Sequence, residues 1–142
     1  MSQELTRNKL QEKAMQLLYS HLLLEQLGKS KDIVTLIEES CDLPFDEVDV
    51  FLKLSLVKAI KYKDELIEYV TPYLRRWKFN RLNLTIQSIL ILSLTHYKFF
   101  PEMEKPIIID VAVKLAKKYG DVTDYKFVNG ILDNCLNDNL RK

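Results

Sequence analysis

The longest uncharged stretch of the chain, residues 82–97, is dominated by large apolar side chains. Its centre, from Leu84 to Leu94, reads Leu-Thr-Ile-Gln-Ser-Ile-Leu-Ile-Leu-Ser-Leu, so apolar positions occur all round a helical wheel. A helix of this kind has to be surrounded by protein. The whole uncharged stretch of 82–97 has 16 residues, fewer than the roughly 20 that a membrane span needs. The β-branched residues also suit a buried strand, but no second segment offers a partner strand, so we predict a buried central helix.

Amphipathic patterns with helical spacing lie on both sides of this stretch. In residues 6–27, for example, Leu10, Ala14 and Leu17 recur at intervals of three and four positions. Gly130 falls inside a helical pattern, where it indicates the close approach of a neighbouring helix or a ligand, packing being the commoner reason. We expect the remaining helices after Asp32 as N-cap, over 46–70 as one helix or two, over 106–119 with Gly120 as the stop, and over 124–135 with Asp124 as N-cap.

Composition supports an all-α fold. Of the 142 residues, 47% are hydrophobic and 29% are charged, and only three are glycine and four proline. Such a chain has little capacity for β-hairpins or Gly-rich phosphate loops. It is also long enough to bury a core without help from metals or crosslinks. We therefore predict a single all-α domain over residues 1–142.

Cysteines and histidines offer no candidate for catalysis or metal binding. Cys41 and Cys135 are far apart in the sequence, and reduced thiols in a cytoplasmic protein are the expectation. The first residues lack the apolar segment of a secretion signal. His21 lies on the apolar face of its predicted helix and His96 ends the central helix, so both are expected to be packed or hydrogen-bonded. We expect no enzyme activity, no metal and no cofactor.

Charge is distributed unevenly along the chain although its net value is only +1. Residues 1–71 hold 9 Lys/Arg against 13 Asp/Glu, a net charge of −4, whereas residues 72–142 hold 12 against 7, a net charge of +5. Between Asp32 and Val50 every charged residue is acidic. A polyanion should avoid that segment, whereas a basic protein could bind it.

Two basic segments each have two interpretations. Residues 72–81 mix four basic with three aromatic side chains, which suits single-stranded nucleic acid because cations meet phosphates and rings stack on bases. The alternative is that the rings seat the segment on the core and the bases are solvated. Lys114, Lys117 and Lys118 share the outer face of a predicted helix with Asp110, and a solvated lysine stripe is the default explanation.

The sequence also contains two blocks of recognisable motif. The residues concerned are Arg7-x-Lys9-x3-Lys13-Ala14-x-Gln16-Leu17-Leu18-Tyr19 in the first helix, and Ala112-Val113-x-Leu115-Ala116-Lys117-x-Tyr119-Gly120 followed by Lys126-Phe127-Val128-Asn129-Gly130-Ile131-Leu132-Asp133. Together with Pro72-Tyr73-Leu74 and the spacing between blocks, they resemble the NusB family of transcription antitermination factors over nearly the whole chain. The Phe-Val-Asn-Gly block is the more specific match.

The resemblance implies a fold and a function. The fold would be a seven-helix domain of two small bundles around the buried central helix. The function would be non-enzymatic: binding of the single-stranded boxA element of ribosomal RNA leader transcripts, together with NusE, a small-subunit ribosomal protein, in the transcription elongation complex. We expect a monomer or a weak homodimer, with no membrane association.

The resemblance also implies which residues meet RNA. Lysine and arginine would supply salt-dependent affinity for phosphates, while amide and aromatic side chains can contact unpaired bases. Phe127 is ambiguous, since an aromatic early in an amphipathic helix is more often part of the core. The positions carried over are Arg7, Lys9, Lys13 and Gln16 in the first helix, Tyr73 and Arg76 in the linker, and Lys126, Phe127 and Asn129 in the last helix.

Several positions depart from the family's usual pattern. Residues 1–13 hold few basic side chains where the family usually has several arginines. The family also tends to place an arginine at Ile91, a glutamate at His96 and an Asn-Glu pair at Asp110-Val111. The low basicity of residues 1–13 favours an alternative function, a NusB-like adaptor that binds a basic protein through its acidic segment and binds little or no RNA, whereas the Lys126–Gly130 block opposes it.

Overall fold

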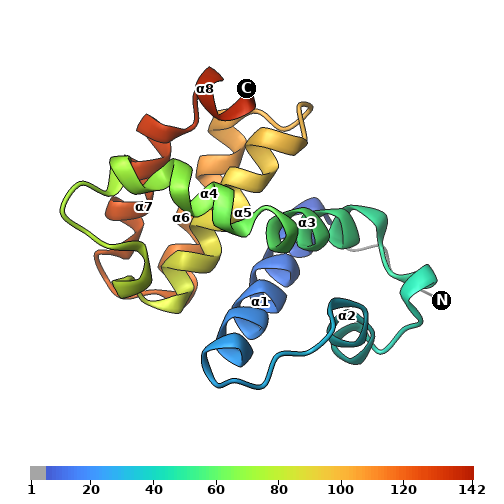
Figure 1. The fold of residues 1–142 in the computed structure, drawn as a ribbon. Helices are drawn as coiled ribbons and strands as arrows, with labels where there is room; N and C mark the ends of the chain where they lie inside the picture. Colours follow the sequence, from blue (N-terminus) through green and yellow to red (C-terminus); the bar gives the residue numbers. More distant parts are fainter. Residues whose placement is uncertain (1–5) are drawn as a thin grey trace.

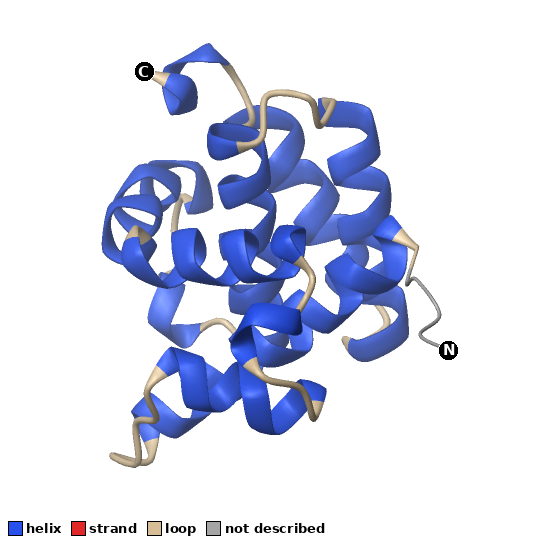
Figure 2. Cartoon of the chain, turned by 90° about the vertical axis from the view of Figure 1, so that its right-hand side faces the viewer, coloured by secondary structure: helices blue, strands red, loops and turns tan. Residues whose placement is uncertain are grey.

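The structure, a computed structural model, describes residues 6–142, which fold into eight α-helices and no strand (Figure 1, Figure 2). The all-α prediction is confirmed, and the structure adds a one-turn helix to the seven expected. The helices are α1 (Arg7–Gln26), α2 (Ile33–Cys41), α3 (Val50–Lys61), α4 (Lys63–Val70), α5 (Leu84–Phe99), α6 (Lys105–Tyr119), α7 (Asp124–Cys135) and α8 (Asp138–Arg141). Three 3₁₀ turns join them: η1 (Phe45–Glu47), η2 (Thr71–Leu74) and η3 (Phe79–Arg81).

The helices form two groups that share α5. Helices α1, α2 and α3 lie on one side in Figure 1, and α4, α6, α7 and α8 gather on the other. Helix α5 contacts α1 and α3 of the first group and α4, α6, α7 and α8 of the second. The prediction of two small bundles around a central helix is thereby confirmed.

Helix α5 is buried along most of its length. Every residue from Ile86 to Tyr97 is buried, including several with polar side chains. A buried polar group destabilises a protein unless it finds a hydrogen-bond partner. The hydroxyls of Ser88, Ser93 and Thr95 each donate to the backbone carbonyl four residues earlier, at 2.7 Å. The helix therefore satisfies its own hydroxyls and presents an apolar surface to both bundles.

The acidic segment folds largely around its own hydrogen bonds. As predicted, Asp32 is the N-cap of α2 and accepts from the Thr35 backbone N–H at 3.1 Å. Asp49 caps α3 in the same way, accepting from the Leu52 N–H at 3.1 Å. The helical pattern over 46–70 resolves into the two helices α3 and α4, which meet at Tyr62.

Asp124 has a different role from the one predicted. It is the first residue of α7, after Thr123 as N-cap, and does not cap the helix itself. Its Oδ2 instead accepts from the Asp121 backbone N–H at 2.8 Å and from the Asn83 side chain at 3.2 Å. Asp124 therefore ties the α6–α7 turn to the start of α5, a long-range contact that the local sequence could not reveal.

The two glycines of this region have opposite surroundings. A Cβ on Gly120, the C-cap of α6, would lie 2.7 Å from the Ala116 carbonyl oxygen and 2.7 Å from Asp124 Oδ2, so only glycine fits. Around Gly130, by contrast, a Cβ would find no atom of the described chain within 4 Å, and the residue is exposed. The expectation that a neighbouring helix packs against Gly130 is wrong.

Both cysteines are free thiols, as predicted. Cys41 is half-buried and Cys135 is buried. Burial raises the pKa of both thiols, that of Cys135 to about 12, because a thiolate is poorly solvated in an apolar environment. A thiol with a raised pKa is a weak nucleophile, so neither cysteine is activated for chemistry.

The burial of α5 makes a direct prediction about stability. Replacing the fully buried Leu90 or Leu94 with alanine leaves a cavity in the core, and should lower the free energy of unfolding by about 2–5 kcal/mol. Chemical denaturation measures the effect. Glu102→Ala, at an exposed position after α5, is the control and should change stability by less than about 0.5 kcal/mol. Equal losses at Leu90 and Glu102 would contradict the assignment of α5 as the core helix.

Candidate nucleic-acid interface

A chain of polar contacts joins α1 to α6. The Glu12 carboxylate accepts hydrogen bonds from Lys118 Nζ at 2.6 Å and from the Tyr119 hydroxyl, and lies 3.8 Å from Lys9 Nζ. Gln16, one turn along α1, donates to the Tyr119 hydroxyl at 2.9 Å. We call these five residues the α1–α6 seam. The spacing of apolar residues along α6 predicts a buried Tyr119, but this side chain is 38% exposed and its hydroxyl organises the seam.

The seam stays positively charged at its surface. Hydrogen bonds from Lys118 and Tyr119 hold the pKa of Glu12 below its usual range, and Glu12 in turn raises the pKa of Lys118. The carboxylate is therefore ionised and offsets part of the lysine charge. Lys9, Lys118 and the neighbouring Lys114 line one hollow of about 350 Å³, with their side chains 56–65% exposed. The Lys118 ammonium pairs with Glu12 and that of Lys114 pairs with Asp110 at 2.9 Å, so Lys9, 3.8 Å from Glu12, has the least neutralised charge of the three.

Arg7 and Lys13, also on α1, contact other helices and are not part of the seam. The Arg7 guanidinium lies over the Phe51 ring of α3, with Cζ 3.8 Å from the ring centroid, a cation–π contact. Lys13 Nζ donates to the Ser40 carbonyl at 3.1 Å, near the C-terminal end of α2, where a positive charge is favoured by the helix dipole. The basic residues of α1 thus face three different helices and do not form one cluster.

A second hollow, of about 370 Å³, lies where the linker meets α7. The rings of Trp77 and Phe127 meet edge to face there, with centroids 6.1 Å apart, and Arg81 lines the same hollow. Trp77 is 50% exposed, whereas Phe127 is partly buried and packs against the core as well. We call this site the Trp77 hollow; its other lining residues are Leu82, Asn83, Ile86, Thr123 and Asp124.

The linker, residues 72–81, contains both aromatic side chains that pack on the core and side chains that face solvent. Phe79 is buried and seats η3 on the core. Tyr73 is half-buried, with its ring 5.6 Å from that of Tyr69 and its hydroxyl accepting from Asn137 Nδ2 at 3.2 Å. Arg76, however, is exposed beside Trp77 in the chain. The sequence pattern by itself could not tell which of these rings face solvent.

Lys126 and Asn129 occupy the outer surface of α7. Both are exposed, and a separation of three residues places them on one face of the helix. Lys126 Nζ lies 6.0 Å from the Tyr125 ring centroid, and Lys117 Nζ of α6 lies 4.7 Å from the same centroid. An exposed Asn129 leaves its amide available to a ligand, and its exposure argues against a role in satisfying buried polar groups.

The seam and the Trp77 hollow lie on either side of the start of α5. A third hollow, of about 390 Å³, is lined by Gln16 and Tyr119 of the seam and by Thr85 of α5. Asn83 and Ile86, on either side of Thr85 in sequence, line the Trp77 hollow. The three hollows therefore follow one another from α1 and α6, past the N-terminus of α5, to α7. Of the sequence-predicted residues, Lys9, Gln16 and Phe127 line this surface, whereas Arg7, Lys13 and Tyr73 are engaged in the contacts described above.

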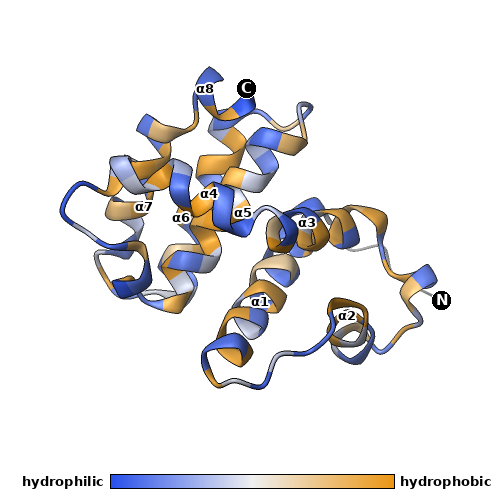
Figure 3. Cartoon of the chain, in the orientation of Figure 1, coloured by the Kyte–Doolittle hydropathy of each residue, from blue (hydrophilic) through white to orange (hydrophobic). Residues whose placement is uncertain are grey.

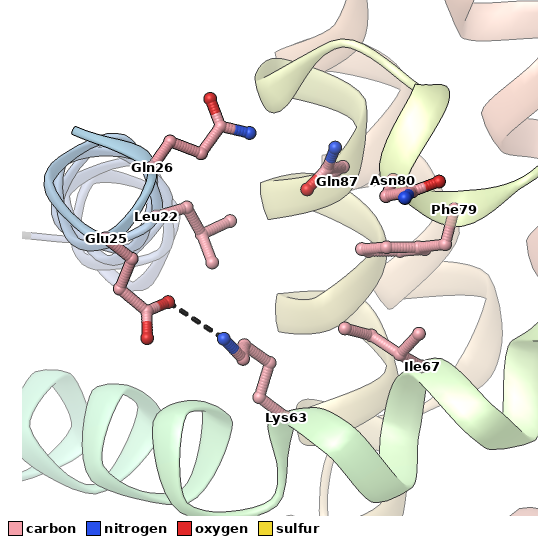
Figure 4. Close-up of a pocket in the computed structure, with 8 residues that line it drawn as sticks. All are labelled: Leu22, Glu25, Gln26, Lys63, Ile67, Phe79, Asn80 and Gln87. Atoms are coloured by element: carbon pink, nitrogen blue, oxygen red, sulfur yellow. Dashed lines mark hydrogen bonds and ion pairs between the residues drawn. The ribbon is translucent and has the colours of Figure 1, made fainter. Parts of the chain in front are cut away.

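A further cavity, of about 330 Å³, opens between the two helix groups (Figure 4). An ion pair between Glu25 of α1 and Lys63 of α4, at 2.8 Å, crosses it. Phe79, Gln26 and Gln87 also line it, and none of the sequence-predicted site residues does. The cavity marks where the two groups meet and is separate from the predicted RNA surface.

His96 is shielded from any substrate. It is 2% exposed, its Nε2 lies 2.9 Å from the Ser55 hydroxyl oxygen, and the Phe51 ring stacks on it. Burial, with the nearby Arg7 charge as a second cause, lowers the pKa of His96 to about 3. The imidazole is therefore neutral at physiological pH and acts as a packed, hydrogen-bonded group, as the sequence suggested.

Two further properties concern the described residues only. Between residues 6 and 142 no three His, Cys, Asp or Glu side chains are grouped as metal ligands would be. None of the helices in that range combines the length and apolar character that crossing a bilayer requires.

Comparison with known proteins places the chain in a class and then in a family. Curated relatives are transcription antitermination proteins, a class of factors that are not enzymes. Those of Bacillus cereus (strain B4264) and Bacillus thuringiensis (strain Al Hakam), both described as transcription antitermination protein NusB, are each 27% identical over 128 residues, covering 90% of this chain and 95% of the relative. The NusB family model matches residues 8–137. The chain belongs to the NusB family.

Solved structures agree with this fold. NusB of T. maritima superposes with a TM-score of 0.80 at 24% identity, over 94% of this chain and 92% of that one. A chain in a crystal structure of NusB and NusE in complex with dsRNA gives a TM-score of 0.74 at 21% identity, over 92% and 95% of the two chains. These likenesses confirm the NusB-like fold.

The buried His96 predicts how stability depends on pH. Unfolded His96 takes up a proton below about pH 6.5, whereas in the folded protein its pKa is about 3. The unfolding free energy should therefore fall as pH drops through this window, by up to about 1.4 kcal/mol per pH unit from this residue alone. His96→Gln removes that titration.

Denaturation between about pH 5 and pH 6.5, where carboxylates contribute little, measures the slope. The unfolding free energy of His96→Gln should depend less steeply on pH than that of the wild-type protein. His21→Gln is the matched control, because His21 is only partly buried and the neighbouring Glu25 carboxylate opposes the lowering of its pKa by desolvation. Identical slopes in the wild-type protein and His96→Gln would show that the imidazole is accessible to protons in the folded state.

Proposed function

We propose that the chain acts as one domain, residues 1–142, in the cytoplasm, binding boxA-type single-stranded RNA of ribosomal RNA leader transcripts together with NusE in the transcription elongation complex. The observation that carries the proposal is the Trp77 hollow. It combines an exposed indole, a second aromatic ring and the Arg81 guanidinium beside the N-terminal end of α7. The same helix also exposes Lys126 and Asn129. Such a combination suits an unpaired nucleotide.

The chemistry of the hollow favours a single strand over a duplex. Bases can stack on an aromatic ring only when they are splayed out of a helix, and stacking of this kind stabilises binding by about 1–3 kcal/mol per base. The half-exposed Trp77 offers such a face, and Arg81 can meet the adjoining phosphate. Phe127 supports the indole from the core side.

The α1–α6 seam would continue the path of the strand. Lys9 and Lys118 present exposed ammonium groups, and Gln16 presents an amide on the same side of α1. Phosphate contacts of this kind position a strand without reading its sequence. Glu12 within the seam moderates the attraction, which agrees with the low basicity of the first 13 residues.

The adaptor alternative has less support from the acidic segment. Asp32 and Asp49 cap helices, Glu38 accepts from the Phe45 backbone N–H at 2.7 Å, and Glu39 pairs with Lys31 at 2.6 Å. These carboxylates are explained by the fold of α2, η1 and α3. Four of the seven acidic side chains of the segment therefore have roles within the fold, and Asp42, Asp46 and Glu47 are exposed.

Titration of fluorescently labelled RNA tests the proposal. The measurement compares a boxA-like single strand with a scrambled strand, each with and without NusE. We expect tighter binding of the boxA-like strand and a further gain in affinity when NusE is present. Binding of NusE with no measurable affinity for either RNA would favour the adaptor function.

Salt dependence should identify the phosphate contacts. Binding to both strands should weaken with salt with a slope of about −0.7 per phosphate contact, and Lys9→Ala should reduce the slope by about one contact without changing sequence preference. Lys13→Ala should have a smaller effect on the slope, because its ammonium already bonds the Ser40 carbonyl. An affinity that does not change with salt would remove the electrostatic part of the proposal.

Asn129 should contribute to discrimination between RNA sequences. Its exposed amide can pair with a base edge, so Asn129→Ala should lower the preference for boxA-like over scrambled RNA by about 1–3 kcal/mol at most and leave the melting temperature nearly unchanged. Asn80→Ala, also exposed but beside the cavity between the helix groups, is the control. Loss of stability with unaltered preference would contradict a base contact at Asn129.

A further inference from the structure

A groove of about 520 Å³ lies where α4 and η2 meet α8, and it shares no lining residue with the three hollows of the candidate RNA surface. Two tyrosine rings and a proline ring form its apolar part, and two glutamates and an asparagine complete it. We call it the tyrosine groove; its lining residues are Glu65, Glu68, Tyr69, Pro72, Tyr73 and Asn139. The RNA contacts proposed at the hollows leave this groove free.

Helix α4 presents one wall of the groove from a single face. Glu68 and Tyr69 follow Glu65 by three and four residues, which places the three side chains next to one another. Leu66 and Val70 are buried on the core side of the same helix. Figure 3 accordingly shows both hydrophilic and hydrophobic stretches along α4. The helix continues directly into η2, so the wall runs on without a break.

Asn137 holds both tyrosine side chains in place. Its Oδ1 accepts a hydrogen bond from the Tyr69 hydroxyl at 3.2 Å, and its Nδ2 donates to the Tyr73 hydroxyl at 3.2 Å. The Tyr69 hydroxyl also donates to the Cys135 carbonyl at 2.7 Å. The two ring centroids are 5.6 Å apart, with the ring planes inclined at 38°. Because the rings are fixed before any ligand arrives, binding loses little side-chain entropy.

The groove also offers hydrogen-bond donors. The Tyr73 hydroxyl accepts from Asn137, and within residues 6–142 its own hydrogen has no acceptor. The amide of Asn139 is exposed and lines the same groove. Both groups can donate to carbonyl oxygens. An α-helix uses its carbonyls for its own hydrogen bonds, whereas an extended peptide leaves them free, so the groove suits an extended peptide.

The charge of the groove is negative. Glu65 and Glu68 are both exposed, and no lysine or arginine of the described residues lines the groove. The family resemblance implies an RNA contact for Tyr73, but the phosphates of RNA would be repelled by the two carboxylates beside it. The groove therefore favours a ligand with a positively charged side chain.

We propose that the tyrosine groove binds a proline-rich segment of a partner protein that carries an arginine or lysine beside its prolines. Such a segment adopts the polyproline II conformation, which has no internal hydrogen bonds and leaves its carbonyls free. Aromatic-lined grooves are a recurring docking site for this conformation. The proline rings lie against Tyr69 and Tyr73, and a peptide carbonyl accepts from the Tyr73 hydroxyl. The cation pairs with Glu65 or Glu68.

Titration of the isotope-labelled protein with a synthetic peptide, followed by NMR, tests the site. The peptide is a run of prolines that ends in arginine. Amide signals of α4, η2 and α8 should shift, and those of the Trp77 hollow should not. Replacing the prolines with alanine should weaken binding at least about tenfold, because the preformed extended helix and its ring contacts are lost. A proline peptide that shifts none of these signals, or an alanine peptide that binds equally well, would overturn the proposal.

Substitution of Tyr73 tests the contribution of the rings. Tyr73→Ala removes one ring and should weaken binding of the arginine-ended peptide at least about tenfold. Tyr73→Phe keeps the ring and loses only the hydroxyl, so it should bind about two- to tenfold more weakly than the wild type. Tyr125→Ala, at a half-buried tyrosine of α7 outside the groove, is the control and should bind like the wild type. Circular dichroism verifies that each variant is folded, and wild-type affinity in folded Tyr73→Ala would contradict the proposed site.

Charge exchange tests the role of the two glutamates, which are exposed and can be replaced without disturbing the core. The wild-type protein should prefer the arginine-ended peptide over the same peptide ending in glutamate by about two- to fivefold at low salt, as an exposed ion pair allows. Glu65→Lys combined with Glu68→Lys should reverse this preference, because like charges then oppose the arginine. Glu102→Lys, at an exposed position outside the groove, is the matched control. An unchanged preference in the double variant would contradict pairing of the cation with these carboxylates.

Competition with RNA separates this site from the proposed function. Saturation with the arginine-ended peptide should leave the affinity for the boxA-like strand unchanged, because the groove and the three hollows share no residue. If the boxA-like strand displaces the peptide, the groove belongs to the RNA surface and the proposal of a peptide site is wrong. A protein that binds the peptide but no RNA would support the peptide site and contradict the RNA function alone.

Discussion

The complete burial of α5 is the constraint on which the rest of the structure depends. A helix that is apolar all round has to be covered on every side, and one small bundle cannot do this alone. The chain therefore wraps α1 and α3 against one side and α4, α6, α7 and α8 against the other. The hydroxyls within α5 bond to its own carbonyls, so the two groups meet it mainly through apolar packing, with the His96–Ser55 contact to α3 as a polar exception.

Because the centre is apolar, the charged and polar groups of the candidate interface lie at the surface, next to the start of α5. The α1–α6 seam joins helices of the two groups, whereas the Trp77 hollow lies between the linker and α7. Their components come from segments far apart in sequence: Gln16 meets Tyr119, and Trp77 meets Phe127. The rigid core helix thus fixes the distance between surfaces that the proposed RNA strand would have to bridge.

The interior also explains how the departures from the family pattern are tolerated. Ile91 and Val111 are buried among apolar neighbours, where an arginine and a glutamate would each have required a partner for their charge. His96 is likewise neutral and bonded to Ser55. Apolar packing can replace a buried ion pair at little cost in stability, so the NusB-like fold persists without the ionic groups the resemblance suggests.

The sequence by itself determined the helices, because amphipathic spacing, N-caps such as Asp32 and the uncharged run of 82–97 act within a few residues of one another. It also indicated the family, through the Lys126–Gly130 block. Only the tertiary structure decided which candidate side chains remain available. Arg7 lies against Phe51, Lys13 against Ser40 and Asp124 against Asn83, each a contact between distant segments that no local pattern encodes. The exposure of Trp77 is likewise set by which neighbours cover the linker, a property of the packed chain alone.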